Sequence, residues 1–209
     1  MPAVASPSAT ASRRPRADRQ RALVQVAYRL IAERGLEGLR FGDVARQAGI
    51  NNGTLLYYFP SKEALVQAVV AYLIEEFSVS QAPRPPAAQL DALAELRGEF
   101  EDARLRLRQQ VGIVYTELLV RSQRDPAVLA SLRHMDDAWR GWLATILDRG
   151  RAQGVFRSDL DTALVTTTIM AVIKGVGLQA VTAGDPNTVD SAMSAVAGLI
   201  ERWLVPPPA

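Results

Sequence analysis

Apolar residues recur every three or four positions along most of the chain, and strand-like alternation is nearly absent. In the first part of the chain this spacing predicts helices over 19–34, 41–47 and 51–58, and a fourth from Ser61 onward. A proline-rich run, Gln81–Pro86, then predicts a domain junction. About five further helices are expected beyond it. The pattern therefore predicts an all-α fold of about nine helices.

Residues suited to helix ends help to place these boundaries. Ser61 is a typical N-cap, and Asp125 and Asp185 each precede a proline, which suits the first turn of a helix. The later helices are expected over 90–97, 100–124, 126–151, 159–183 and 186–204.

Composition excludes several classes of site. The 209 residues are 48% hydrophobic and 22% charged, as in an ordinary soluble globular chain. There is no Cys, and His134 is the only His, so we expect no disulfide, no metal site and no cofactor. The stretch 163–183 is long and apolar enough to span a membrane, but Lys174 and Gln179 favour a buried core helix. We therefore expect a cytoplasmic protein with no membrane partner.

Charge is spread unevenly along the chain. The formal net charge is +2, and residues 1–75 hold ten Lys or Arg against six Asp or Glu. Such asymmetry favours contact with nucleic acid or with another acidic surface near the N-terminus. Residues 1–17 are rich in Ala, Ser and Pro and carry Arg13, Arg14 and Arg16, so we expect a disordered basic arm there.

The window from Gly35 to Leu65 holds two short helices separated by a glycine turn, which is the helix-turn-helix pattern. Short polar side chains at the start of the second helix can reach base edges and phosphates, and tyrosine hydroxyls and a lysine suit phosphate oxygens. The candidate DNA-binding residues are Arg40, Asn51, Asn52, Gly53, Thr54, Tyr57, Tyr58 and Lys62. As alternatives, Asn51 or Asn52 could cap the helix and Tyr58 could belong to the core.

The same window resembles the DNA-binding domain of the TetR/AcrR family of transcriptional regulators, from near Arg19 to near Val70. The matching motifs are Asp43-Val44-Ala45, Ala48-Gly49-Ile50, Gly53-Thr54-Leu55, Tyr58-Phe59 and Ser61-Lys62-Glu63-Ala64-Leu65. The resemblance implies an all-α homodimer that binds a palindromic operator in double-stranded DNA. It also implies a larger C-terminal domain that binds a small-molecule effector and forms a dimer interface from the last two helices. Most such proteins are repressors that the ligand releases from DNA.

Four positions depart from the family pattern. Arg40 stands where a Ser or Thr often caps the second helix, and loss of that cap costs about 1 kcal/mol. Leu56 stands where the family often has Tyr, so Tyr57 is left to carry the phosphate contact. Asn51 and Asn52 replace a commoner Ser-Lys-like pair, which favours base reading over charge.

The resemblance and the junction divide the chain into an arm over 1–17, a helix-turn-helix domain over 18–62, a ligand-binding and dimerisation domain over 63–205 and a tail over 206–209. Aromatic rings with a few polar groups are typical of a small-molecule pocket. The pocket candidates are Phe100, Tyr115, Glu117, His134, Trp139, Trp142, Met170 and Lys174. The interface candidates are Ala171, Gly175, Leu178, Val181, Ala195, Leu199 and Trp203. Each of these residues could instead belong to the core or the surface.

Three functions remain open from the sequence. The first is a dimeric repressor released by a small molecule, and the second is a DNA-binding regulator without such a ligand, acting constitutively or under a partner protein. The third is an enzyme built on Glu117, His134 and Asp137, but no nucleophile elbow, phosphate loop or metal spacing accompanies them. We therefore do not expect an enzyme.

Overall fold

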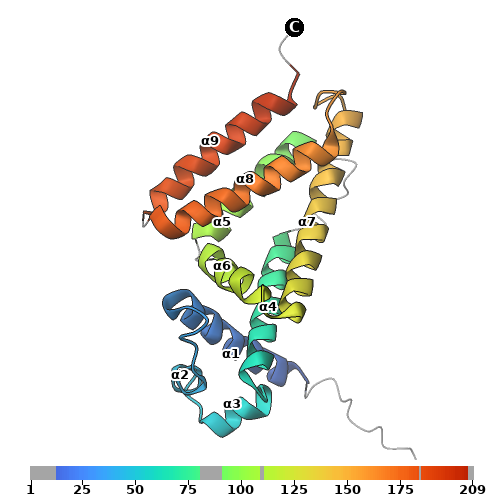
Figure 1. Ribbon diagram of the computed structural model, residues 1–209. Coiled ribbons are helices and arrows are strands. Elements are labelled where there is room, and N and C mark those ends of the chain that lie inside the picture. Colours follow the sequence, from blue (N-terminus) through green and yellow to red (C-terminus); the bar gives the residue numbers. More distant parts are fainter. Residues whose placement is uncertain (1–12, 81–90, 109–110, 184, 207–209) are drawn as a thin grey trace, which may run out of the picture. The chain divides into compact units, whose positions relative to one another are not determined.

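The computed structural model describes residues 13–80, 91–108, 111–183 and 185–206, which form nine helices and no strand (Figure 1). This confirms the predicted fold class. The helices are α1 (Arg13–Arg34), α2 (Phe41–Gln47), α3 (Asn52–Tyr58), α4 (Lys62–Ser80), α5 (Ala92–Arg108), α6 (Val111–Ser122), α7 (Pro126–Ala152), α8 (Thr162–Ala183) and α9 (Pro186–Leu204).

The chain divides into two compact units, Met1–Tyr72 and Leu73–Ala209, so the division falls inside α4 rather than after residue 62 as expected. The reason is that the first turns of α4 pack with α1. The ring of Tyr72 lies edge-on to that of Tyr28, with centroids 5.6 Å apart, and the guanidinium of Arg21 lies over Tyr72.

The helix α1 also begins earlier than the sequence indicates. Residues 13–17 were expected in the disordered arm but are helical. Residues 1–12, which make up the rest of that expected arm, lie outside the described residues.

The first unit buries the apolar faces of three short or moderate helices against each other. From α1 it buries Leu23, Ala27, Leu30 and Ile31, and from α2, α3 and the residue after α3 it buries Val44, Ala45, Leu55 and Phe59. Gly49 forms the turn between α2 and α3 with φ +66°, a left-handed conformation that favours glycine. The turn holds α3 in a fixed orientation beside α2.

Side-chain caps begin several helices where the sequence predicts them. Ser61 Oγ accepts a hydrogen bond from Ala64 N at the start of α4, which confirms Ser61 as an N-cap. Asp125 and Asp185 likewise accept from backbone N–H groups at the starts of α7 and α9. Arg40, at the N-cap of α2, makes no side-chain cap, as its residue type indicates.

The predicted break between 97 and 100 is wrong, because α5 continues through Gly98. The helix extends to Arg108, the last residue described before α6, which begins at Val111. The buried residues of α5 explain the continuity, since they form one stripe at helical spacing across the glycine. They are Ala92, Glu95, Leu96, Glu99, Phe100 and Ala103. A glycine inside a helix costs only about 1 kcal/mol relative to alanine, which this burial outweighs.

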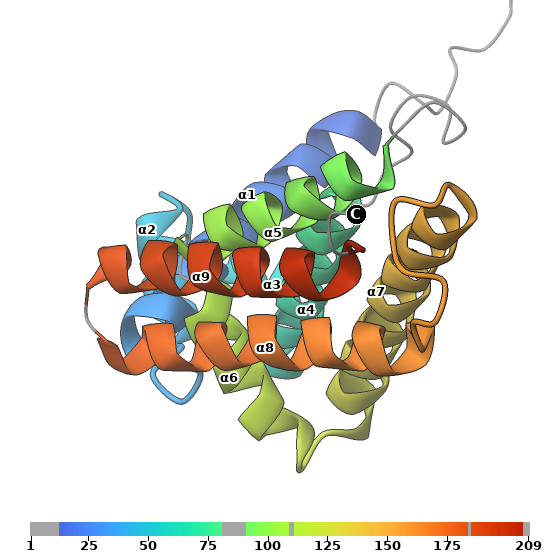
Figure 2. The ribbon, with the colours of Figure 1, turned by 90° about the horizontal axis from the view of Figure 1, so that it is seen from above.

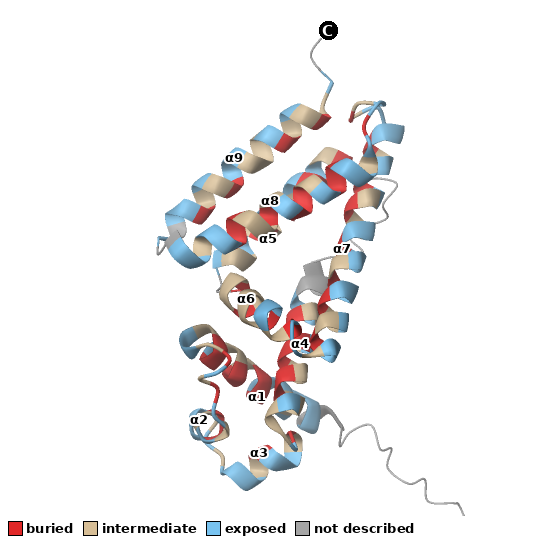
Figure 3. Ribbon diagram, in the orientation of Figure 1, coloured by how far each residue is buried: buried red, intermediate tan, exposed pale blue. Residues whose placement is uncertain are grey.

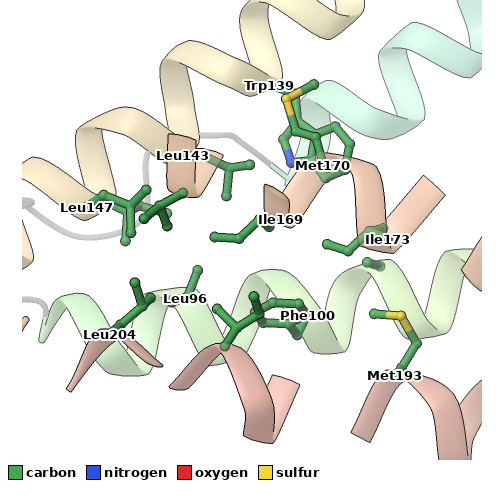
Figure 4. Close-up of a cluster of buried hydrophobic side chains, with 14 of the residues drawn as sticks. Leu96, Phe100, Trp139, Leu143, Leu147, Ile169, Met170, Ile173, Met193 and Leu204 are labelled. Atoms are coloured by element: carbon green, nitrogen blue, oxygen red, sulfur yellow. The ribbon is translucent and has the colours of Figure 1, made fainter. Parts of the chain in front are cut away.

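The second unit packs α5, α7, α8 and α9 around one hydrophobic core (Figure 4). Figures 1 and 2 show α8 and α9 side by side, with α5 next to α9. The outer edge of the α5–α9 contact carries ion pairs, including Arg97 with Glu201 and Arg104 with Asp190. Two hydrogen bonds join Arg97 to Glu201 and raise the pKa of the arginine while lowering that of the glutamate.

The apolar helix α8 is the one described helix that is long and apolar enough to cross a membrane, over Thr162–Thr182. It packs against α6, α7 and α9 and buries Val165, Ile169 and Ile173 among them. Its place in the core accounts for part of this apolar composition, since 39% of the span is buried.

Two glycines of α7 offer a direct test of this core. A Cβ on Gly150 would lie 2.0 Å from the buried ring of Phe156, whereas a Cβ on Gly141 would meet nothing within 4 Å. We expect Gly150→Ala to lower the free energy of unfolding by about 1–3 kcal/mol through overpacking. Gly141→Ala, the control, should raise it by up to about 1 kcal/mol through helix propensity. Urea unfolding of both variants checks this, and equal effects would contradict the proposed packing of Phe156.

Candidate DNA-binding surface and ligand cavity

The helix α3 buries one residue, Leu55, and turns most of the others outward (Figure 3). Asn52, Gly53, Leu56 and Tyr57 are exposed, whereas Thr54 and Tyr58 are half-buried. Since Leu55 and the following Phe59 supply the packing, the remaining side chains of α3 are free to contact a partner. The structure thus gathers the candidate residues of positions 51–58 on one short helix.

Asn51 acts as the N-cap of α3. Its Oδ1 atom accepts a hydrogen bond from Thr54 N at 2.7 Å, and its backbone is extended, as an N-cap requires. The capping alternative raised for this asparagine therefore applies in the free protein. Asn52, one residue later, is exposed at the first position of the helix.

The two tyrosines at the end of α3 lie against each other, with ring centroids 5.3 Å apart in an edge-to-face arrangement. The side chain of Tyr57 is 64% exposed, and the guanidinium of Arg16 lies 4.9 Å from its ring centroid. The first turns of α1 therefore place a cation beside the exposed end of α3, which sequence spacing alone does not indicate.

Two other candidates flank α3. Arg40 is exposed and donates a hydrogen bond to the carbonyl oxygen of Glu37 at 2.8 Å, and Lys62 is half-buried at the first position of α4. On α2, Asp43 pairs with both Arg34 and Arg46. This pairing was not expected, and it fixes an exposed arginine, Arg46, on the helix that precedes the turn.

The second unit contains a cavity of about 420 Å³ between α5, α6, α7 and α8. Most of its wall is apolar, with a few polar and charged groups. The lining residues are Glu99, Ala103, Arg106, Leu107, Val111, Gly112, Tyr115, Thr116, Leu119, Met135, Asp136, Trp139, Ile173, Lys174, Gly175, Gly177 and Leu178. A cavity of this size and character is typical of a small-molecule site, for which volumes of about 300–1,000 Å³ are usual.

Glu99 is the most buried charged residue of the wall. Trp139 Nε1 donates a hydrogen bond to Glu99 Oε1 at 2.9 Å, and Arg106 lies 3.8 Å from the same oxygen. Burial raises the pKa of Glu99, while Arg106 and the indole of Trp139 oppose the shift by favouring the carboxylate. The glutamate thereby joins α5 to α7 at the cavity.

A second charged pair spans α7 and α8. Lys174 Nζ donates to Asp136 Oδ2 at 2.6 Å and lies 5.8 Å from the ring centroid of Tyr115. The other carboxylate oxygen, Asp136 Oδ1, is buried and accepts no hydrogen bond from the part of the chain that the structure describes. The lysine that breaks the apolar run of α8 therefore has a specific partner beside the cavity.

The sequence-predicted pocket residues divide into two groups. Tyr115, Trp139 and Lys174 line the cavity, whereas the others do not. Phe100 and Met170 belong to the core (Figure 4). Trp142 packs against that core. The last two are Glu117, which is half-buried, and His134, which is exposed.

The predicted interface residues also divide. Ala171, Val181, Ala195 and Leu199 are exposed on α8 and α9, and Leu199 is 60% exposed. Leu178 is 59% exposed and also lines the cavity, as does Gly175. Trp203, by contrast, packs against the core.

Sequence reasoning missed three charged residues of the cavity, Glu99, Arg106 and Asp136. A signal existed for the first, because Glu95 and Glu99 stand four residues apart within the apolar stripe of α5. Acidic side chains on a buried face require partners, and Glu95 has one in Arg149. Asp136 carries no comparable signal, because its partner comes from a distant helix.

Comparison with known proteins agrees with this geometry. Residues 23–69 match the family model described as bacterial regulatory proteins of the tetR family, and residues 104–205 match the C-terminal domain of BetI-type transcriptional repressors. The transcriptional repressor KstR2 of Mycolicibacterium smegmatis is 30% identical over 77% of this chain and 75% of its own. KstR2 of Rhodococcus jostii is 29% identical over 70% and 72%, respectively.

Solved structures share the fold. A transcriptional regulator from Saccharomonospora viridis, solved in complex with choline, superimposes with a TM-score of 0.79 over 91% of this chain and all of its own, at 26% identity. The matched proteins are transcriptional regulators and not enzymes, which sets the enzyme alternative aside. With a helix-turn-helix unit and a helical second unit that both match its models, this chain belongs to the TetR family of transcriptional regulators.

Proposed function

We propose that this protein is a homodimeric repressor that binds a palindromic operator through α3 and leaves it when a small molecule occupies the cavity of the second unit. It acts in the cytoplasm, where operator DNA lies. The observation that carries the proposal is that one chain has both an outward-facing α3 and a largely apolar cavity of about 420 Å³. The relatives named above as repressors support the direction of regulation.

In this proposal α3 enters the major groove. Asn52, exposed at the first position of α3, pairs with a base edge, and adenine is the usual partner of an asparagine amide. Asn51, Gly53 and Thr54 lie near the backbone of the same half-site, and Tyr57 donates to a phosphate. Tyr58, Lys62 and Arg40 add further contacts to the phosphates.

The proposed dimer forms through α8 and α9. Large apolar side chains stay exposed on both helices, including Leu164, Leu178 and Val181 on α8 and Leu199 on α9. Apolar surface gathered on two adjacent helices is costly in water and marks an interaction site. A second copy of the same pair of helices would cover it.

Release works through α4, which belongs to both units. A dimer must hold its two reading helices about one DNA turn apart, roughly 34–36 Å. Ligand binding among α5, α6, α7 and α8 displaces α4 and changes that separation. The choline bound to the Saccharomonospora viridis regulator supports a small-molecule effector for this architecture. The cavity also favours this function over a regulator that lacks a ligand.

DNA recognition is testable with an operator selected from a pool of random duplexes. Asn52→Ala should weaken binding to that operator by about 1–3 kcal/mol and leave binding to unrelated DNA nearly unchanged, since the amide reads a base. Lys62→Met should lower the slope of log affinity against log salt by about 0.9 for each lost phosphate contact. Arg133→Met, which removes an exposed cation from α7, is the control and should keep the slope.

Fluorescence anisotropy across a salt series measures both effects. Operator affinity unchanged in Asn52→Ala would contradict the role given to this residue. A selection that enriches no sequence at low salt would overturn the proposed function itself.

The dimer is tested by a charge placed on its proposed surface. Leu199→Glu should dissociate the protein into monomers, because a buried, unpaired carboxylate at an interface is strongly unfavourable. Operator affinity should fall with it, since two half-sites are then read independently. Ala130→Glu adds the same side chain to an exposed position of α7 and should change neither property. Sedimentation equilibrium measures the mass, and a wild-type monomer would refute the interface.

A further inference from the structure

The four charged side chains of the cavity form two pairs of opposite charge. Arg106 lies 3.8 Å from Glu99, and Lys174 donates to Asp136 at 2.6 Å. The rest of the wall is formed mainly by apolar side chains and by the rings of Tyr115 and Trp139. The formal charge of the lining is therefore zero. A charged ligand would find no group of opposite charge in the lining that is not already in an ion pair.

One polar atom of this wall lacks a partner. Asp136 Oδ1 is buried and accepts no hydrogen bond from any described residue, whereas its other oxygen is held by Lys174. The indole N–H of Trp139 is already donated to Glu99, and the hydroxyl of Thr116 to the carbonyl oxygen of Gly112. A buried acceptor without a donor is unfavourable, and the Asp136 side chain, which is 30% exposed and belongs to the cavity wall, can turn this oxygen toward a ligand that donates to it.

These pairings disfavour charged ligands. A carboxylate would have to displace Asp136 or Glu99 from its cation, and displacement of Glu99 would leave a buried negative charge behind. A quaternary ammonium has no N–H to offer Asp136 Oδ1, and the ring face of Tyr115 that would attract it already faces Lys174 Nζ, 5.8 Å from the centroid. A protonated amine can donate, but it adds an unpaired positive charge to an apolar wall.

We infer that the effector is an uncharged, largely apolar molecule with a hydroxyl or N–H group that donates to Asp136 Oδ1. The inference rests on the proposed function, because it takes the cavity to be the effector site. The apolar body of the ligand packs against Leu107, Val111, Leu119, Met135, Ile173 and Leu178. The expected ligand thus differs in class from the choline bound to the Saccharomonospora viridis regulator, which is a small quaternary ammonium.

A matched series of ten-carbon probes tests the class of ligand. The probes are decan-1-ol, its methyl ether, decanoate and decyltrimethylammonium, each titrated into the full-length protein by calorimetry. The alcohol should bind about tenfold more tightly than the ether, which keeps the chain and loses the donor. It should also bind more tightly than either charged probe.

Paired variants connect the preference to Asp136. The double variant Asp136→Leu/Lys174→Met removes the acceptor and its cation together, so the lining stays neutral, and it should bind the alcohol no better than the ether. The double variant Arg133→Met/Asp137→Leu removes two exposed charges from α7 outside the cavity and should keep the preference. Affinity for the ether should be nearly the same in all three proteins, which shows that the apolar cavity is intact.

The outcomes separate this inference from the proposed function. Equal affinity for alcohol and ether, tighter binding of a charged probe, or binding of no probe by a protein that still binds its operator would each overturn the ligand class. Alcohol binding that depends on Asp136 but leaves the operator complex intact would support the ligand class and contradict release. Failure to bind any operator would count against the proposed function alone.

A separate observation concerns the recognition helix. Leu56 is 49% exposed on α3, one helical turn after Asn52, while Leu55 and Phe59 supply the packing of this segment. A large aliphatic side chain on an exposed helix face has no role in the core. Among the groups that DNA presents in the major groove, the C5-methyl of thymine is the apolar one.

We infer that Leu56 contacts a thymine methyl group, so that each half-site carries an A·T pair beside the base read by Asn52. This also accounts for leucine at a position where a tyrosine would bind phosphate instead. The contact adds specificity through apolar burial, with no charge or hydrogen bond.

Replacement of each operator thymine by deoxyuridine removes only the methyl group. In each half-site, one thymine should be the one that Leu56 contacts. Its replacement in a single half-site should lower wild-type affinity about fourfold, the equivalent of about 0.8 kcal/mol for one buried carbon group. Leu56→Ala should be insensitive to the same replacement, whereas Leu105→Ala, which truncates an exposed leucine of α5 outside the cavity, should respond as the wild type does. A wild type that tolerates deoxyuridine at every position, or a Leu56→Ala variant that remains sensitive, would overturn the inference.

Discussion

The hydrogen bond from Trp139 to the buried carboxylate of Glu99 connects the hydrophobic core of the second unit to its cavity. Trp139 belongs to the core cluster through its ring and to the cavity wall through the same side chain. Glu99 stands among apolar neighbours on α5, where an ionised group persists only with such partners. The position of α5 against α7 therefore depends in part on a polar contact that also forms part of the cavity wall.

Helix ends in this protein also serve more than one purpose. Asn51 begins α3 by accepting from Thr54 N, and the cap leaves Asn52 exposed as the first helical residue. The Asn51 cap thus determines both where α3 begins and which side chain, that of Asn52, occupies its first position. The turn at Gly49 adds to this, because its left-handed backbone permits α2 and α3 to follow each other closely. Local backbone chemistry accordingly determines which residues face outward.

Much of the fold could be predicted because its signals are local. Helical spacing gave the fold class, and the caps Ser61, Asp125 and Asp185 gave helix starts. The break near Gly98 was wrong because a local signal, glycine, competed with burial along the whole of α5, which depends on α7 and α9. The division of the units inside α4 was missed for a similar reason, since it rests on the contact of Tyr72 with Tyr28, residues far apart in sequence.

The two candidate sites also differ in how far local sequence signals could predict them. Most of the candidate DNA-binding residues fall within one short segment, 51–58, so the sequence pattern already groups them on one helix. The cavity instead assembles single residues from four helices, and only Tyr115, Trp139 and Lys174 were recognised among them. What distinguishes a cavity residue such as Asp136 from an exposed neighbour such as Asp137 is one step of helical rotation, and only the packing of α7 against α8 decides which carboxylate meets Lys174. The candidate DNA-binding surface can therefore be recognised from local sequence, whereas the chemistry of the cavity wall depends on tertiary contacts.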